Sequence, residues 1–138
     1  AHVVSWRPAG LPEQLYLSPR AQAGPGQAVR GGIPVIFPQF ERRGPLPRHG
    51  FARDRAWTLV EHGPQRQHAQ AVLRLTDTDA TRAVWPHAFE AELTVSLSGR
   101  ALEMELAVLN TGDRAFEFTA ALHTYLRCDD VREVRVSG

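Results

Sequence analysis

The sequence predicts an all-β fold, specifically an antiparallel β-sandwich, and two observations carry that prediction. Apolar and polar residues alternate in residues 89–98, again in residues 102–108, and once more in residues 116–122. Strict alternation is typical of strands that bury one face. Short turns, Ser98-Gly99-Arg100 and Asn110-Thr111-Gly112-Asp113, join these segments. Consecutive alternating segments with such turns indicate an antiparallel meander and hence a sandwich.

The part of the chain before this meander contains shorter elements. Two strands are expected at residues 2–6 and 14–17, on either side of Pro8-Ala9-Gly10. Residues 21–55 then hold roughly half of the glycine and proline residues and have few periodic apolar positions. This stretch is therefore predicted to be a long loop, and long loops in compact domains are often functional.

One more hairpin and one helical turn complete the predicted elements. The hairpin pairs residues 57–62 with residues 70–76 across a turn at Gly63-Pro64. The helical turn covers residues 79–84, with Asp79 as its cap and Pro86 after its end.

Composition excludes several classes of function. The net charge of +1 provides no field that would favour nucleic acid or an anionic membrane, and no apolar run is long enough for a membrane helix. Every basic residue is an arginine, so chemistry based on a lysine Schiff base is excluded within this chain. Cys128 is the only cysteine, which leaves no internal disulfide and indicates a reducing, cytoplasmic setting.

Common catalytic and ligand-binding motifs are missing from the sequence. The six histidines show neither HxH nor HExxH spacing, so no metal site is predicted. Gly31-Gly32 is not part of a P-loop, because no GxxxxGK[ST] pattern is present. No GxSxG motif indicates a nucleophilic serine.

The long loop instead concentrates donors suited to an anion. Three arginines and one histidine lie in it: Arg30, Arg48, His49 and Arg53. Guanidinium groups bind phosphate or carboxylate oxygens two at a time, and neighbouring glycines let the backbone approach a ligand closely. The alternative is that these arginines are solvated and pair with Glu41 or Asp54, as most surface arginines do. Spacing alone does not distinguish phosphate from carboxylate.

His123, in Leu122-His123-Thr124-Tyr125, is the candidate proton donor. A histidine has a reference pKa of about 6.5, so it can give up and take back a proton near neutral pH. Tyr125 shares its face of the expected strand and could orient the ring. The alternative is a purely structural hydrogen-bonding role for His123.

Taken together, these segments resemble the hexose-6-phosphate mutarotases (glucose-6-phosphate 1-epimerases) of the aldose 1-epimerase superfamily. The likeness extends along nearly the whole chain. It is carried by the following motifs in this order: Ala1-His2-Val3-Val4-Ser5-Trp6, Leu17-Ser18-Pro19, Arg30-Gly31-Gly32-Ile33-Pro34, Phe37-Pro38-Gln39-Phe40, His49-Gly50-Phe51-Ala52-Arg53, Trp85-Pro86-His87, Asn110-Thr111-Gly112 and Leu122-His123-Thr124-Tyr125.

The resemblance implies a galactose mutarotase-like β-sandwich, no cofactor, and a role for each candidate residue. Arg30 and Arg53 would bind the substrate phosphate. Arg48 matches a substrate-binding position at which some relatives have glutamine, and His49 would also bind substrate. His123 would protonate the ring oxygen while a glutamate takes the proton of the anomeric hydroxyl. The ring then opens, rotates about C1–C2 and closes to the other anomer.

The resemblance also implies that residues 1–138 are a single partial domain. It places the glutamate base and a substrate-binding aspartate beyond residue 138, and a short segment before Ala1. We therefore expect weak or no anomerisation of glucose 6-phosphate by the chain alone, measured by polarimetry. Exposed strand edges and apolar faces would favour self-association.

Three other functions stay open on the sequence. A sugar-phosphate-binding module without catalysis fits the same arginines and fold but needs no proton from His123. A purely structural β domain fits the near-zero net charge and the absence of an assigned glutamate base. An epimerase of unphosphorylated aldoses fits the fold, but the arginines argue against it. The expected partner is a small hexose 6-phosphate, with no nucleic acid and no membrane.

Overall fold

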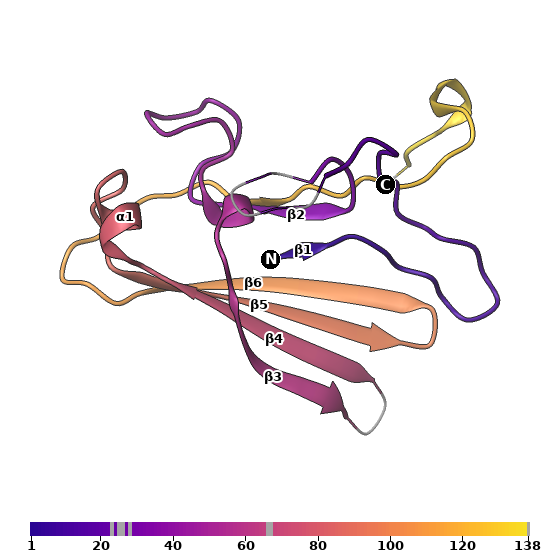
Figure 1. Ribbon diagram of the computed structural model, residues 1–138, viewed down its shortest axis with the longest axis horizontal. Helices are drawn as coiled ribbons and strands as arrows, with labels where there is room; N and C mark the ends of the chain where they lie inside the picture. The colour runs from indigo at the N-terminus through magenta and orange to yellow at the C-terminus, as the bar shows by residue number, and fades with distance from the viewer. Residues whose placement is uncertain (23, 25–26, 28, 66–67, 138) are drawn as a thin grey trace.

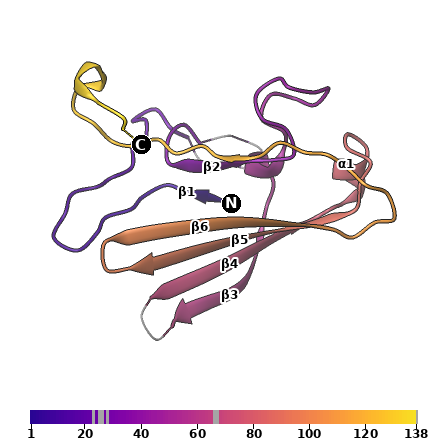
Figure 2. The same cartoon turned by 180° about the vertical axis from the view of Figure 1, so that it is seen from behind.

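The structure, a computed structural model, describes residues 1–22, 24, 27, 29–65 and 68–137. Its strands form two antiparallel sheets, which make up two layers seen from either side in Figures 1 and 2. The strands are β1 (His2–Val3), β2 (Ile33–Ile36), β3 (Thr58–Pro64), β4 (Ala69–Thr76), β5 (Phe89–Ser98), β6 (Ala101–Asn110) and β7 (Ala121–Leu122). One sheet has the order β1-β2-β7 and the other β3-β4-β5-β6, which confirms the predicted all-β sandwich.

The four-stranded sheet follows the predicted alternation closely. β5 and β6 pair along their whole lengths, from Phe89 opposite Asn110 to Ser98 opposite Ala101. Phe89, Ala91 and Leu93 are buried, whereas the residues between them are only half-buried. One face of β5 therefore covers the core, as a period of two requires.

Strand β2 lies inside the stretch predicted to be a loop, so that prediction is wrong for residues 33–36. All four residues of Ile33–Ile36 are buried. Such a strand is covered on both faces and reads as a short apolar run without alternation. Residues 23, 25, 26 and 28 of the same predicted loop lie outside the described residues.

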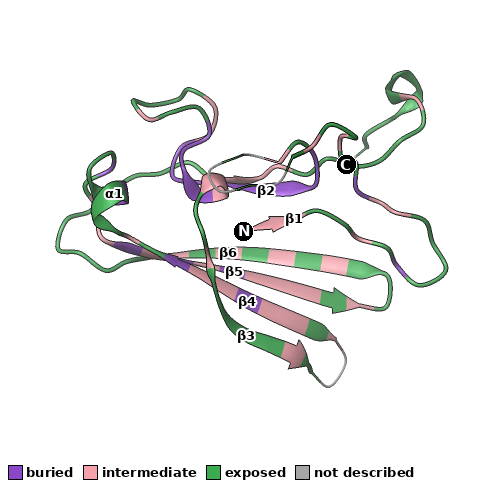
Figure 3. Cartoon of the chain, in the orientation of Figure 1, coloured by how far each residue is buried: buried purple, intermediate pink, exposed green. Residues whose placement is uncertain are grey.

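An aromatic cluster joins the two layers next to β2. The ring of Phe37 lies 5.5 Å from that of Trp85 and 5.3 Å from that of Phe89. Phe51, which precedes the short 3-10 helix η1 (Ala52–Asp54), packs on the same group. Figure 3 shows the buried residues concentrated where β2 and its loops face the first half of β5. Core packing thus fixes the parts of this stretch around Val35, Phe37 and Phe51.

Three local predictions need correction. Gly63 and Pro64 are the last residues of β3 and pair with β4, so they do not form the turn of that hairpin. The helix α1 spans Asp79–Arg82, and its cap is Thr78, not Asp79: the Thr78 hydroxyl accepts from the Thr81 N–H. A second 3-10 helix, η2 (Val131–Glu133), was not predicted.

Of the two strands expected near the N-terminus, the first is shorter than predicted and the second does not form. The first, β1, is limited to His2–Val3. Residues 14–17 form no strand; instead Leu15 makes an isolated bridge with Leu126, and Leu17 makes one with Gly31.

The last predicted strand, residues 116–122, is mostly wrong because the chain leaves the large sheet after β6. Only Ala121–Leu122 pairs as a strand, and its partner is β2 in the other sheet. On the way, the ring of Phe118 packs 5.3 Å from that of Phe37, and the Thr119 N–H donates to the carbonyl oxygen of Pro38 (3.0 Å). These contacts draw the segment across to the small sheet and place His123 there.

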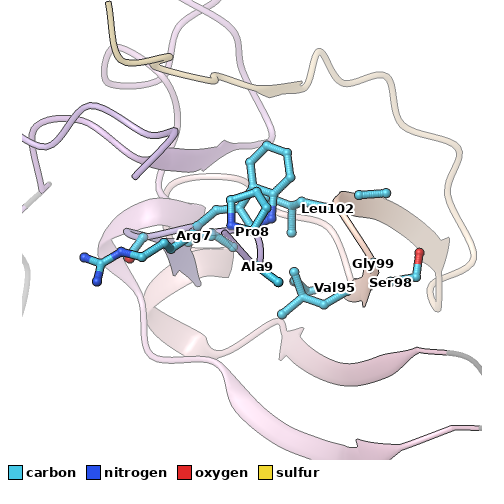
Figure 4. A pocket seen from close by; sticks show the side chains of 12 residues that line it. Arg7, Pro8, Ala9, Val95, Ser98, Gly99 and Leu102 are labelled. Atoms are coloured by element: carbon cyan, nitrogen blue, oxygen red, sulfur yellow. The ribbon is translucent and has the colours of Figure 1, made fainter. Parts of the chain in front are cut away.

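The end of the sandwich near the β5–β6 turn is less closely packed. A cavity of about 320 Å³ lies there between the loop after β1 and the ends of β5 and β6, lined by Arg7, Pro8, Val95 and Leu102 among others (Figure 4). Leu97 on β5 is 45% exposed. No helix among the described residues is long and apolar enough to cross a membrane.

Candidate functional site

Strand β2 brings the segments that carry the candidate residues together. The His123 N–H donates to the carbonyl oxygen of Pro34 (3.1 Å), directly beside β7. After β2, the carbonyl oxygen of Phe37 accepts from the N–H groups of Phe51 and Ala52 (3.0 and 3.1 Å), which places the segment from His49 to Arg53. The candidate residues therefore lie on segments that bond to β2 or to its immediate continuation.

The two glycines before β2 are needed for close backbone contact. Gly31 and Gly32 have φ angles of 110° and 64°. A Cβ on Gly31 would lie closer than 3.0 Å to the backbone of Tyr16, and one on Gly32 equally close to the carbonyl oxygen of Val3. These glycines let three protein segments meet, whereas the sequence alone predicts close approach of a ligand there.

His49 is the most buried of the candidate residues, with 8% of its surface exposed. Its Nδ1 accepts a hydrogen bond from the Glu41 N–H (3.2 Å). Its own N–H donates to the carbonyl oxygen of Glu41 (3.0 Å). Glu41 thus holds both the ring and the backbone of His49, with one hydrogen bond to each.

The ring of His49 faces the ring of His123. Their centroids lie 5.8 Å apart with the ring planes nearly perpendicular. Tyr125 stacks on the ring of His123, with the two ring centroids 4.8 Å apart and the ring planes inclined by 23°. Tyr125 is therefore in contact with His123, and its role in orienting that ring stays a prediction.

Positive charge surrounds His49. The pKa of His49 lies below its ordinary value of 6.5, first because the ring is buried and then because the charges of Arg53, Arg48 and His123 act on it. The carboxylate of Glu41 opposes this shift. Two guanidinium groups and two imidazoles therefore share one electrostatic environment, in which an anion would be stabilised.

The two arginines of this group differ in their partners. The guanidinium of Arg48 forms an ion pair with the Glu41 carboxylate (2.6 Å), which is the alternative that the sequence left open. Arg53 donates from a terminal nitrogen to the carbonyl oxygen of Arg48 (3.3 Å). Its Nε is buried and lies 3.8 Å from a carboxylate oxygen of Asp54, without a hydrogen bond to any described residue. Arg53 therefore keeps unused donor capacity.

Arg30 lies three residues before β2 and is exposed. Its carbonyl oxygen accepts from the Ser18 N–H (3.0 Å). No hydrogen bond or ion pair joins its side chain to another described residue. The structure thus brings Arg48, His49, Arg53 and His123 together, and connects Arg30 to them only through the backbone.

His2 is a residue of this region that sequence reasoning did not assign to the site. Its Nε2 lies 2.7 Å from the carbonyl oxygen of Gly31. Its pKa is lowered from 6.5, mainly by burial, and the charge of Arg53 contributes. His2 therefore connects the segment of Arg30 with Arg53. In the sequence, His2 lies in the first motif of the resemblance, residues 1–6, which gives no indication of this contact.

The part of the chain that the structure describes contains no group of three or more histidine, cysteine, aspartate or glutamate side chains that could hold a metal ion. The arrangement can bind an anion through guanidinium groups and can exchange a proton through an imidazole.

Comparison with known proteins identifies relatives along the whole chain. A family model described as Aldose 1-epimerase matches residues 1–138. Two proteins named "Putative glucose-6-phosphate 1-epimerase" are similar. The one from Escherichia coli (strain K12) is 41% identical over 143 residues, covering 100% of this chain. The one from Cenchrus ciliaris is 39% identical over 146 residues, covering 99% of this chain. The chain spans 46% and 44% of the lengths of these two relatives.

Solved structures share the fold. A crystal structure described as a putative mutarotase from Salmonella typhimurium superposes with a TM-score of 0.80 at 35% identity, over 91% of this chain and 41% of that one. The Slr1438 protein from Synechocystis sp. PCC 6803 gives a TM-score of 0.80 at 34% identity, over 92% of this chain and 47% of that one. The galactose mutarotase-like fold expected from the sequence is thereby confirmed.

Proposed function

The chain belongs to the aldose 1-epimerase family, and we propose from this membership that it carries part of the active site of an isomerase of carbohydrate metabolism. The reaction is the interconversion of the α and β anomers of hexose 6-phosphates such as glucose 6-phosphate. The names of the two relatives at 41% and 39% identity support this substrate.

The observation that carries the proposal is the group of imidazoles and guanidiniums beside β2. The His49 and His123 rings lie 5.8 Å apart, and the charges of Arg48 and Arg53 act on His49. A hexose phosphate requires cations for its ester and a proton carrier at its ring, and both kinds of group are present on one surface.

In this reaction His123 donates a proton to the ring oxygen O5 as the C1–O5 bond breaks. A carboxylate base removes the proton of the anomeric hydroxyl, and C1 becomes an aldehyde. Rotation about C1–C2 exposes the other carbonyl face, and the reverse proton transfers close the ring. We assign the base to no carboxylate of this chain.

The phosphate ester orients the sugar without taking part in the reaction. Arg53 is the main phosphate ligand in this proposal, because its terminal nitrogens make only one hydrogen bond to the described residues, to the carbonyl oxygen of Arg48 at 3.3 Å. Arg30 approaches from the exposed side. Arg48 can bind the substrate only if its ion pair with the Glu41 carboxylate breaks.

We further propose that residues 1–138 form one partial galactose mutarotase-like domain that acts in the cytoplasm, where Cys128, an exposed free thiol, stays reduced. The unpaired edges of β3 and β6 in the described sheet would favour self-association.

Exchange NMR on glucose 6-phosphate tests the catalytic role of His123. Added formate can replace the unassigned base, so we expect the chain with formate to accelerate anomer exchange more than formate alone. The His123→Asn variant should lose this acceleration but still bind the sugar phosphate. Equal rates for both proteins would remove His123 as the acid and favour a binding module without catalysis. No binding of glucose 6-phosphate by either protein would contradict the proposal as a whole.

A further inference from the structure

One buried side-chain amide, that of Gln39, binds the backbone at two points of the loop of residues 39–49. Gln39 is 4% exposed. Its Nε2 donates to the carbonyl oxygens of Glu41 (3.1 Å) and Leu46 (3.0 Å), and its Oε1 accepts from the Leu46 N–H (3.0 Å). Both amide hydrogens and the amide oxygen are therefore used to hold the backbone of this loop.

The same loop holds His49 through Glu41. The Glu41 carbonyl oxygen, which Gln39 binds, also accepts from the His49 N–H (3.0 Å). The Glu41 N–H donates to His49 Nδ1 (3.2 Å). Glu41 and His49 both have left-handed backbones, with φ angles of 54° and 71°. Non-glycine residues adopt this conformation at a cost, so the surrounding contacts must maintain it.

These contacts determine which nitrogen of His49 carries the proton. A nitrogen that accepts a hydrogen bond from an N–H group has a free lone pair, so Nδ1 is unprotonated. The neutral ring then carries its proton on Nε2. In the described part of the chain, Nε2 makes no hydrogen bond, which leaves it available as a donor beside the His123 ring.

We propose that Gln39 is a positioning residue: it fixes the backbone of Glu41 and, through Glu41, the orientation and the tautomer of His49. This inference rests on the proposed function, in which His49 binds the substrate. With its proton on Nε2, His49 donates a hydrogen bond to a sugar oxygen while His123 transfers its proton to the ring.

Long-range ¹H–¹⁵N spectra of the chain labelled at histidine nitrogens test this inference without substrate. Wild type should show His49 as a single tautomer with the proton on Nε2. Gln39→Met has a similar shape but no hydrogen-bonding groups, so His49 should become a mixture of both tautomers. The affinity for glucose 6-phosphate should fall about tenfold, because a displaced binding group costs about this much or more.

Two further variants separate positioning from general effects. Gln70→Met, in β4, removes an amide whose Oε1 lies 3.3 Å from Nε2 of His68, and it should leave the tautomer of His49 unchanged. Glu41→Gln removes the ion pair with Arg48 but keeps both backbone contacts to His49, so the Nε2–H tautomer should also persist.

A wild-type His49 with its proton on Nδ1, or as a mixture, would overturn the inference, even if Gln39→Met does not fold. An unchanged tautomer in a folded Gln39→Met would overturn it as well. Because these spectra need no substrate, a chain that fails to bind glucose 6-phosphate disproves the proposed function separately.

Discussion

The two layers of this molecule are built in different ways. The sheet of β3 to β6 has strands of 7 to 10 residues, and its ladders are continuous except for one register shift in β3 between Leu59 and Glu61. The other layer, which we call the β2 platform, consists of β1, β2, β7 and residues 37–53, and its strands have only 2 to 4 residues. All five candidate residues lie on the platform or on the chain next to its strands. The regularly paired strands thus support the fold, and the irregular segments carry the candidate functional residues.

The difference indicates how the layers should respond to substitution. Backbone strain is found in the platform, where Glu41 and His49 have positive φ angles without being glycine. In the large sheet the side chains of β5 bury the core. Substitutions of buried residues in either layer should therefore lower stability, whereas substitutions of the exposed or half-buried arginines of the platform should chiefly change ligand binding.

The largest expected effect is loss of stability from Leu93→Ala. Leu93 on β5 is 0% exposed, so the variant leaves a cavity, and the free energy of unfolding should fall by about 2–5 kcal/mol in urea denaturation. Leu97→Ala is the matched control, because Leu97 lies on the same face of β5 but is 45% exposed. Leu97→Ala should lower the free energy of unfolding by less than about 1 kcal/mol. Equal losses would show that the sheet does not carry the core.

Gly31→Ala tests the close backbone packing just before β2. The new Cβ would collide with the backbone of Tyr16, in a residue whose φ is 110°. We expect a loss of about 2–4 kcal/mol, from the left-handed backbone and the collision together, and weaker binding of glucose 6-phosphate. In Gly99→Ala, with a φ of 52° and open space around the Cβ, only the backbone cost of about 1–2 kcal/mol should appear. Equal losses in both variants would contradict the close approach at Gly31.

The same contrast explains how much of the fold the sequence predicts. β5 and β6 alternate because each has one covered face, so their positions follow from a period of two. β2 has no alternation because all four of its residues are buried. β7 escapes prediction for another reason: residues 116–122 alternate like a strand, but the contacts of Phe118 and Thr119 direct them to the other layer. Such tertiary contacts leave no local pattern.

The candidate site shows a similar division. The residue types and the motif around Arg53 and His123 indicate anion binding and proton transfer, and the structure brings these segments together beside β2. The contact of His2 with Gly31 was not predictable, because it depends on the pairing of β1 with β2. The ion pair of Arg48 with Glu41 was weighed only as an alternative, since spacing does not decide which carboxylate an arginine meets.

Arg53→Ala should change binding with little effect on stability. Hydrogen bonds to charged groups are worth about 1.5–3 kcal/mol, so the affinity for glucose 6-phosphate should fall about 10- to 100-fold. Binding of glucose, which has no phosphate, should change far less; calorimetry on both sugars measures the difference. Arg100→Ala, in the exposed turn between β5 and β6, is the control and should affect neither sugar. An equal loss for both sugars would remove the phosphate assignment.

The smallest expected effect is the response of His49 to pH. Its pKa is lowered from 6.5 by burial and by neighbouring cations, so the folded protein binds this proton less readily than the unfolded chain. The contribution of His49 to stability is therefore complete above pH 6.5 and is lost as the pH falls through the lowered pKa. Arg53→Gln should raise the pKa of His49 more than Arg48→Gln does, because Arg53 has the larger effect, and Glu41→Gln should lower it further. NMR titration of the His49 ring measures all three shifts. A wild-type His49 that titrates at or above 6.5 would contradict the combined effect of burial and neighbouring cations on this ring.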